Sequence, residues 1–233
     1  MDRGATLYLN TGGTFESTAY WAGRLDEATR SVALGDVDGD GDLDLVRGNL
    51  ANGGSAGTTL YLNAGGAFAL EPAWTGEAAA SVALGDVDDD GDLDLVLGNS
   101  DRGPMLYLNT GGTFESAPVW RGPVEATLSI ALGDVDGDGD LDLVRGNTNE
   151  GTTLYLNTGG MFATTRVWTS PVQNTEKALS WATWMATADS TSSARTPTRA
   201  RRSSQHRRRV RERARLDGPD RVHHRRRPGR RGW

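Results

Sequence analysis

Short runs of alternating apolar and polar residues extend over residues 1–170, separated by turns that contain glycine. The runs "SVALGDV" and "LDLVRGN" alternate valine and leucine with polar residues, and "TTLYLN" adds β-branched and aromatic side chains. Alternation with a period of two residues, bounded by glycine turns, is typical of half-buried β-strands. We find no helical periodicity in this region, so the pattern predicts an all-β fold.

The strand pattern repeats. The segment "LYLN" begins at Leu7, Leu60, Leu106 and Leu154, and a glycine pair, a phenylalanine and a tryptophan follow each time. A period of 46–53 residues with about four short strands is typical of β-propeller blades. We therefore expect an incomplete propeller with half a blade in residues 1–30 and three blades in residues 31–80, 81–128 and 129–180. The last strand of the first blade should end near Phe68.

An acidic stretch recurs once in each predicted blade, with the spacing D-x-D-x-D-G-x-x-D from Asp36, Asp86 and Asp134. Ca²⁺ takes six to eight oxygen ligands, which alternate residues of a tight loop can supply. We predict carboxylate ligands at loop positions one, three, five and nine, a backbone carbonyl at position seven, and about three calcium sites. The predicted ligands are Asp36, Asp38, Asp40, Asp42 and Asp44; Asp86, Asp88, Asp90, Asp92 and Asp94; and Asp134, Asp136, Asp138, Asp140 and Asp142.

Two other interpretations of these loops are weaker. An EF-hand needs a bidentate glutamate at position twelve, where this chain has Arg47, Leu97 or Arg145, and it needs flanking helices rather than strands. A solvated acidic turn without metal remains an alternative. Mg²⁺ fits less well than Ca²⁺ because it prefers water ligands and strict octahedral geometry.

The segments "VALGDVDGDGDLDLV" from Val32, "VALGDVDDDGDLDLV" from Val82 and "IALGDVDGDGDLDLV" from Ile130, each followed by "LYLN", resemble the FG-GAP/VCBS repeat family. The best-known members form the seven-bladed propeller of integrin α chains. The resemblance covers about residues 1–170. It implies calcium in a loop of each blade, an extracellular or cell-surface setting, and adhesion or ligand binding through the propeller. The chain departs from the family pattern because it has too few blades to close a propeller.

Other recurring residues have simpler interpretations. The tryptophans suggest stacking on carbohydrate, but recurrence once per repeat favours packing between blades. Arg47 and Arg145 could bind an acidic partner. Leu97 occupies the matching place in the second blade, however, which favours the interpretation that both arginines lie at the surface and have no functional role. Asn49, Asn99 and Asn147 are expected at turns or strand ends.

Catalysis has little support in the sequence. The chain has no cysteine, and its histidines are His206, His223 and His224, so residues 1–190 lack the usual nucleophile–base pairs and histidine ligands for zinc. A pair of carboxylates could still serve a glycosidase, although metal binding already accounts for the aspartates. We therefore expect a protein that is not an enzyme.

Charge divides the chain sharply. Residues 1–190 hold 28 acidic and 9 basic residues, whereas residues 191–233 hold 3 and 16. The basic tail could bind nucleic acid. The amino-acid sequence of the tail favours another explanation. The nucleotide string CTGGGCGACGTGGATGG encodes L-G-D-V-D-G of the acidic loop in the first reading frame, W-A-T-W-M in the second and G-R-R-G-W in the third. These readings occur at Trp181–Met185 and Gly229–Trp233. We therefore expect residues 181–233 to be out-of-frame translation without a stable fold.

No apolar run approaches the roughly 18 residues that span a bilayer, and the start of the chain is no signal peptide. "DRG" precedes "LYLN" at both Asp2–Gly4 and Asp101–Gly103, so we expect an internal piece of a longer secreted repeat protein. The expected function is calcium-stabilised adhesion, ligand binding or scaffolding. Its partners would be a protein or carbohydrate and the missing blades or neighbouring domains of the parent protein. One alternative is the non-catalytic propeller of a secreted carbohydrate-active enzyme, and a weaker one is nucleic-acid binding by the tail.

Overall fold

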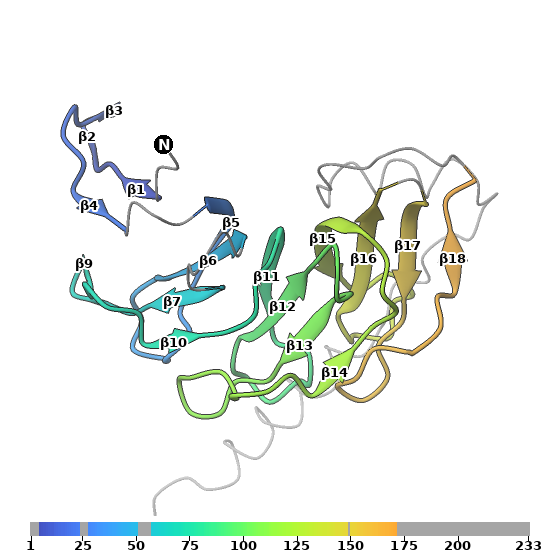
Figure 1. Ribbon diagram of the computed structural model, residues 1–233. Helices are drawn as coiled ribbons and strands as arrows, with labels where there is room; N and C mark the ends of the chain where they lie inside the picture. The colour runs from blue at the N-terminus through green and yellow to red at the C-terminus, as the bar shows by residue number, and fades with distance from the viewer. Residues whose placement is uncertain (1–4, 24–27, 51–56, 149, 172–233) are drawn as a thin grey trace, which may run out of the picture. The chain divides into compact units, whose positions relative to one another are not determined.

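The computed structural model describes residues 5–23, 28–50, 57–148 and 150–171 (Figure 1). Every regular element within these ranges is a β-strand, as the alternating pattern predicts. None of the described elements is a helix of the length and apolar character required to cross a membrane. The expectations for residues 181–233 fall outside the described residues.

Three antiparallel sheets of four strands each form the body of the described chain. The first is β5 (Ala28–Gly35), β6 (Asp44–Leu50), β7 (Thr59–Tyr61) and β10 (Trp74–Thr75); the second is β11 (Ser81–Gly85), β12 (Asp94–Gly98), β13 (Met105–Tyr107) and β14 (Trp120–Arg121); the third is β15 (Thr127–Gly133), β16 (Asp142–Asn147), β17 (Gly151–Tyr155) and β18 (Trp168–Thr169). In each sheet, strands consecutive in this list are hydrogen-bonded neighbours, so each sheet is an up-and-down meander. These sheets are consistent with propeller blades, and no closed sheet occurs among the described residues. We refer to them as the first, second and third repeats.

Residues 5–23 supply part of a further repeat. Strand β1 (Thr6–Leu7) pairs with β4 (Trp21–Ala22), which matches the pairing of β7 with β10 in the first repeat. Two short hairpins extend beyond the sheets, β2 (Asn10–Thr11) with β3 (Thr14–Phe15) and β8 (Asn63–Ala64) with β9 (Ala67–Phe68). The described residues of this region thus form one strand pair and one hairpin, and their assignment as half a blade stays a prediction.

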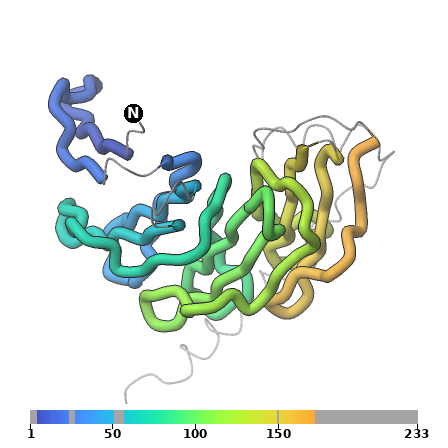
Figure 2. The backbone as a smooth tube through the Cα atoms, viewed as in Figure 1, coloured from blue at the N-terminus to red at the C-terminus, as the bar shows by residue number. Residues whose placement is uncertain are grey.

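The fourth strand of the first sheet lies later in the sequence than Phe68. The segment at Phe68 folds back onto Asn63 as part of the β8–β9 hairpin and does not join the main sheet. The tryptophan supplies the fourth strand instead, since Trp74 pairs with Leu60 in β7. Figure 2 shows this excursion of the backbone between β7 and β10. A strand of two residues is too short to show an alternating pattern, which explains the error.

Aromatic packing joins consecutive repeats. Trp74 of the first repeat meets Tyr107 and Phe114 of the second edge to face, at centroid distances of 5.2 and 5.3 Å. Trp120 of the second repeat packs in the same way on Tyr155 and Phe162 of the third. Such pairs stabilise by about 1 kcal/mol beyond the burial of their area. Packing between repeats, the favoured interpretation of the tryptophans, is therefore confirmed for these two.

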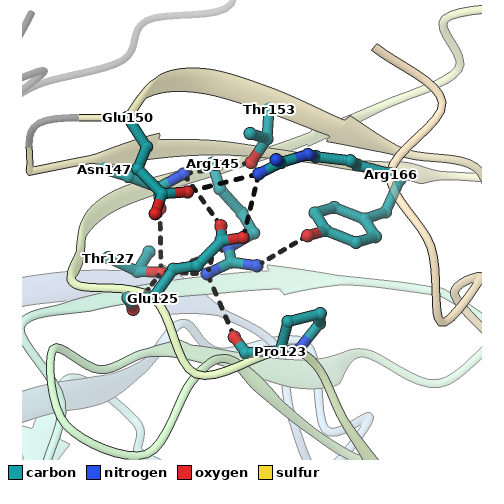
Figure 3. Close-up of polar contacts among 9 residues, drawn as sticks. Pro123, Glu125, Thr127, Arg145, Asn147, Glu150, Thr153 and Arg166 are labelled. Carbon is teal, nitrogen blue, oxygen red and sulfur yellow. Dashed lines mark hydrogen bonds and ion pairs between the residues drawn. The ribbon is translucent and has the colours of Figure 1, made fainter. Parts of the chain in front are cut away.

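The surface positions expected for Arg47 and Arg145 are wrong, because both side chains are completely buried. Arg145 donates hydrogen bonds to the Thr127 hydroxyl, at 2.7 Å from Nη2, and to the Tyr155 hydroxyl at 3.1 Å (Figure 3). It also forms an ion pair of 3.3 Å with Glu125. These partners surround the guanidinium, so it can be buried without being left unpaired. Burial lowers the pKa of Arg145 and raises that of Glu125, and the nearby arginines oppose the second shift.

Candidate metal centre

The acidic stretches form the loops that join the first two strands of each sheet. The first loop is closed where Gly35 pairs with Asp44, and the second where Gly85 pairs with Asp94. The turn within the first loop needs a residue with positive φ at position six, which is Gly41 with a φ of 95°. A side chain would strain this conformation, so glycine permits the tight return of the chain.

The loops bring carboxylates together. Asp36, Asp38 and Asp40 each place an oxygen within 4.8 Å of the others, and so do Asp86, Asp88 and Asp90. In the third loop the corresponding group is Asp134, Asp136 and Asp142. Positions one, three and five thus converge in two loops, whereas the third loop uses position nine in place of position five. The structure identifies three groups that can hold a metal ion, and the complete set of fifteen ligands remains a prediction.

Backbone hydrogen bonds fix the orientation of these carboxylates. Asp36 Oδ2 accepts a hydrogen bond from the Gly41 N–H at 3.0 Å, and Asp86 Oδ2 accepts one from Gly91 at the same distance. Asp40 Oδ1 accepts a bond from the Asp42 N–H at 2.8 Å. Each loop is therefore folded around its own aspartates, with position one bound across the turn to position six.

Some carboxylate oxygens in these groups lack a partner. Asp36 Oδ1 and Asp88 Oδ1 are both buried and accept no hydrogen bond. Burial raises the pKa of Asp88, and the negative charges of Asp90 and Asp86 raise it further. A buried oxygen without a donor is unfavourable, and a bound cation would satisfy it. The donors are all hard oxygens, which fit Ca²⁺ or Mg²⁺ rather than a metal that prefers nitrogen or sulfur.

Position nine has a structural role that the sequence did not reveal. Asp94 is completely buried; its Oδ2 accepts a bond from the Val87 N–H and its Oδ1 one from the Asn109 N–H, both at 2.8 Å. Asp44 and Asp142 make the same pair of contacts in their repeats. Burial raises the pKa of Asp94 to about 6, although both hydrogen bonds act in the opposite direction. This residue fastens the acidic loop to the "LYLN" segment of its own repeat.

Position seven also reaches the turn after "LYLN". Asp42 Oδ2 accepts a hydrogen bond from the Gly65 N–H at 2.6 Å, and Asp140 Oδ2 accepts one from Gly159 at 3.2 Å. The expected carbonyl ligand at this position remains a prediction.

The asparagine of "LYLN" is a site residue that sequence reasoning missed. Asn109 is 3% exposed, and its Nδ2 donates to Val37 O of the first loop at 2.8 Å and to Leu93 O of the second at 3.2 Å. Asn157 makes the same two contacts one repeat later, with Val87 O and Leu141 O. The signal was available, because the asparagine recurs in all four copies of the segment, as Asn10, Asn63, Asn109 and Asn157.

The comparison with protein families agrees with this geometry. A family model described as an FG-GAP-like repeat matches residues 1–47 and 86–145. The matched ranges include all three acidic loops with their position-nine aspartates. No curated protein matches the chain.

Proposed function

We propose that this chain is a calcium-binding module of a secreted or cell-surface protein. The premise is that residues 1–47 and 86–145 match a family model described as an FG-GAP-like repeat. The module acts in adhesion, ligand binding or scaffolding for a protein or carbohydrate partner, without catalysis.

The convergence of carboxylates in the acidic loops carries this proposal. Two like charges at 4.8 Å repel by about 3 kcal/mol at an effective dielectric constant of about 20. The unpartnered oxygens of Asp36 and Asp88 add to this unfavourable energy. A bound Ca²⁺ would supply the positive charge and the missing contacts, and its flexible coordination of six to eight oxygens suits loops of this kind better than octahedral Mg²⁺.

The position of the loops supports a scaffolding role. Val37 and Val87, which lie between the candidate ligands, are 2% exposed and pack in cores shared with the following repeat. An ordered loop therefore supports the contact between repeats as well as its own turn. Calcium in these loops would stiffen the array and hold its surfaces in place for a partner.

A calcium titration of the full chain tests the proposal. After removal of metal with a chelator, isothermal titration calorimetry should show uptake of about three Ca²⁺ ions per chain. Calcium at 100 times its Kd should stabilise the folded state by about 2.7 kcal/mol for each site and raise the melting temperature. Asp36→Ala should remove one of the bound ions. A melt that does not change between chelator and millimolar calcium would refute the metal assignment.

A further inference from the structure

A chain of hydrogen bonds connects the three acidic loops through consecutive repeats. It contains one asparagine, one aspartate and one valine from each repeat, and every bond is 2.8 or 2.9 Å long. In order, its members are Asn63, Asp44, Val37, Asn109, Asp94, Val87, Asn157, Asp142 and Val135.

The links between repeats are the two buried asparagines. The Asn109 carboxamide donates to Val37 O, and Val37 lies between the candidate ligands Asp36 and Asp38. The backbone N–H of the same residue donates to Asp94 Oδ1 of the next loop. Asn109 therefore contacts the acidic loop of the preceding repeat with its side chain and the loop of its own repeat with its main chain.

The connection continues inside the second loop. Asp94 Oδ2 accepts from the Val87 N–H, and Val87 O accepts from the Asn157 carboxamide. Val87 lies between Asp86 and Asp88, which are candidate ligands of the second loop. The second loop is thus connected to the first loop through Asn109 and to the third loop through Asn157.

Close packing accompanies these hydrogen bonds. A Cβ placed on Gly112 would lie 3.0 Å from Asp38 Cβ, and one on Gly160 would lie 2.6 Å from Asp88 Cβ. The turn after each of these "LYLN" segments therefore lies directly against a candidate ligand of the preceding loop. Movement of that ligand and movement of the turn cannot be independent.

We infer that the acidic loops bind calcium with positive cooperativity, and that Asn109 and Asn157 are the positioning residues that couple them. The inference rests on the proposed calcium function. Without metal, repulsion among the carboxylates favours loop conformations in which Val37 O and Val87 O move away from their asparagines. Calcium in one loop fixes its carbonyl, which orders the asparagine and the position-nine aspartate of the next loop. Coupling of this kind is reciprocal, so each site should strengthen its neighbour by the same factor.

Calcium titrations followed by NMR on the full chain test the coupling, with the amide signals of Gly41, Gly91 and Gly139 reporting the three loops separately. Asp36→Ala should weaken calcium binding at the second loop by about 5-fold or more, in the range typical of coupled sites. Asp86→Ala should weaken calcium binding at the first loop by the same factor. Both substitutions leave Asn109 and Asn157 in place, so they test the coupling without altering the residues proposed to transmit it. Equal affinity of the neighbouring loop with and without these substitutions would overturn the inference.

Substitution of the asparagines locates the coupling. In the background Asn109→Ala, the substitution Asp36→Ala should no longer affect the second loop, as a double-mutant cycle would show. Asn63→Ala is the matched control, because the Asn63 carboxamide donates to Leu43 O of its own repeat at 3.0 Å. Coupling that survives Asn109→Ala, or that Asn63→Ala removes equally, would contradict the assigned role.

The outcomes separate the two proposals. If none of the three glycine signals responds to calcium, the proposed function fails. If all three respond with affinities that ignore substitutions in the neighbouring loops, the calcium function stands and the coupling fails. Hydrogen exchange at the Val87 amide gives a second measure in the Asp86→Ala chain, whose second loop lacks a candidate ligand. Calcium in the first loop should still slow this exchange at least 5-fold through Asn109.

Discussion

Leu97 and Arg145 occupy the same register position in two consecutive sheets. Leu97 in β12 lies opposite Met105 in β13, and Arg145 in β16 lies opposite Thr153 in β17. Both side chains are completely buried. One position of the repeat is therefore filled by an apolar pair in the second sheet and by a hydrogen-bonded cation in the third, which makes the two solutions exchangeable in a direct test.

Arg145→Leu should destabilise the folded chain. The substitution removes the hydrogen bonds that Arg145 donates to the hydroxyls of Thr127 and Tyr155, and it removes the buried partner of Glu125. Arg166 still pairs with Glu125 at 3.0 Å. Because one ion pair remains, we expect a loss of about 2 kcal/mol in the free energy of unfolding rather than the larger value for an isolated buried charge. Denaturant unfolding in saturating calcium measures this difference.

The combination Arg145→Leu/Thr153→Met reproduces the apolar pair of the second sheet. It should recover about 1 kcal/mol of the loss, because the added methylene groups pack against the new leucine. Thr153→Met alone is the control. It should destabilise by crowding the guanidinium and by removing the hydroxyl that accepts a hydrogen bond from Asn147 Nδ2 at 3.1 Å. If the double variant is no more stable than Arg145→Leu alone, the two solutions are not exchangeable.

Glu77 should make the protein sensitive to acid. Burial favours the neutral form of this carboxyl, but hydrogen bonds from Arg121 and Arg102 outweigh it and lower the pKa of Glu77 below 4.5. A carboxyl whose pKa is lowered by folding stabilises the folded state at pH values above its ordinary pKa. This stability is lost as the pH falls through the lowered pKa of the folded state. Since both arginines are exposed, the contribution should be below about 1 kcal/mol.

The matched variant for this prediction is Glu77→Gln. The free energy of unfolding of the native chain should exceed that of the variant at pH 6 and converge with it as the pH falls well below 4.5. Subtraction of the two curves removes the titration of the acidic loops, which both proteins share. A difference that stays constant from pH 6 to 3 would show that the ion pairs do not stabilise the fold.

The repeat period was sufficient to predict the three sheets and their acidic loops. Short runs rich in valine and leucine mark β11 and β12, and the aspartate spacing marks the loop between these strands. Local sequence therefore contains most of what builds one sheet, and repetition makes the assignment firm.

Contacts between repeats were much harder to predict. The burial of Arg145 depends on Glu125, which lies before the sheet that contains the arginine. The role of Asn109 depends on Val37 O, 72 residues earlier. Every residue has a backbone carbonyl, so the residue type does not reveal which carbonyl accepts a hydrogen bond. A side chain that binds a main-chain oxygen therefore leaves no pattern of paired residue types in the sequence. The sequence therefore predicted the aromatic packing between repeats, because the tryptophan recurs, but it did not predict the contacts made to main-chain oxygen.

Asp94→Asn and Asp90→Asn should separate the structural role of position nine from a ligand role. In chelator, Asp94→Asn should lower the free energy of unfolding by about 1–3 kcal/mol, because the new amide group cannot accept one of the two buried backbone bonds. Asp90→Asn should be neutral or slightly stabilising without metal, since it removes a like charge. In calcium, both variants should be less stable than the native chain. Equal behaviour of the two variants in chelator would refute the structural role of Asp94.

Gly160→Ala should weaken both the fold and the second metal loop. Gly160 and Gly66 occupy the same place after "LYLN" and have φ values of 85° and 89°, so alanine strains the backbone equally at both. They differ in what the new methyl group would meet, which is Asp88 Cβ at 2.6 Å for Gly160 and nothing within 4 Å for Gly66. We expect Gly160→Ala to destabilise the folded chain by about 2 kcal/mol more than Gly66→Ala. Because Asp88 must move, calcium affinity at the second loop, read from the Gly91 amide, should fall with Gly160→Ala and stay unchanged with Gly66→Ala. Equal effects of the two substitutions on that affinity would mean that the contact between repeats does not hold the ligand in place.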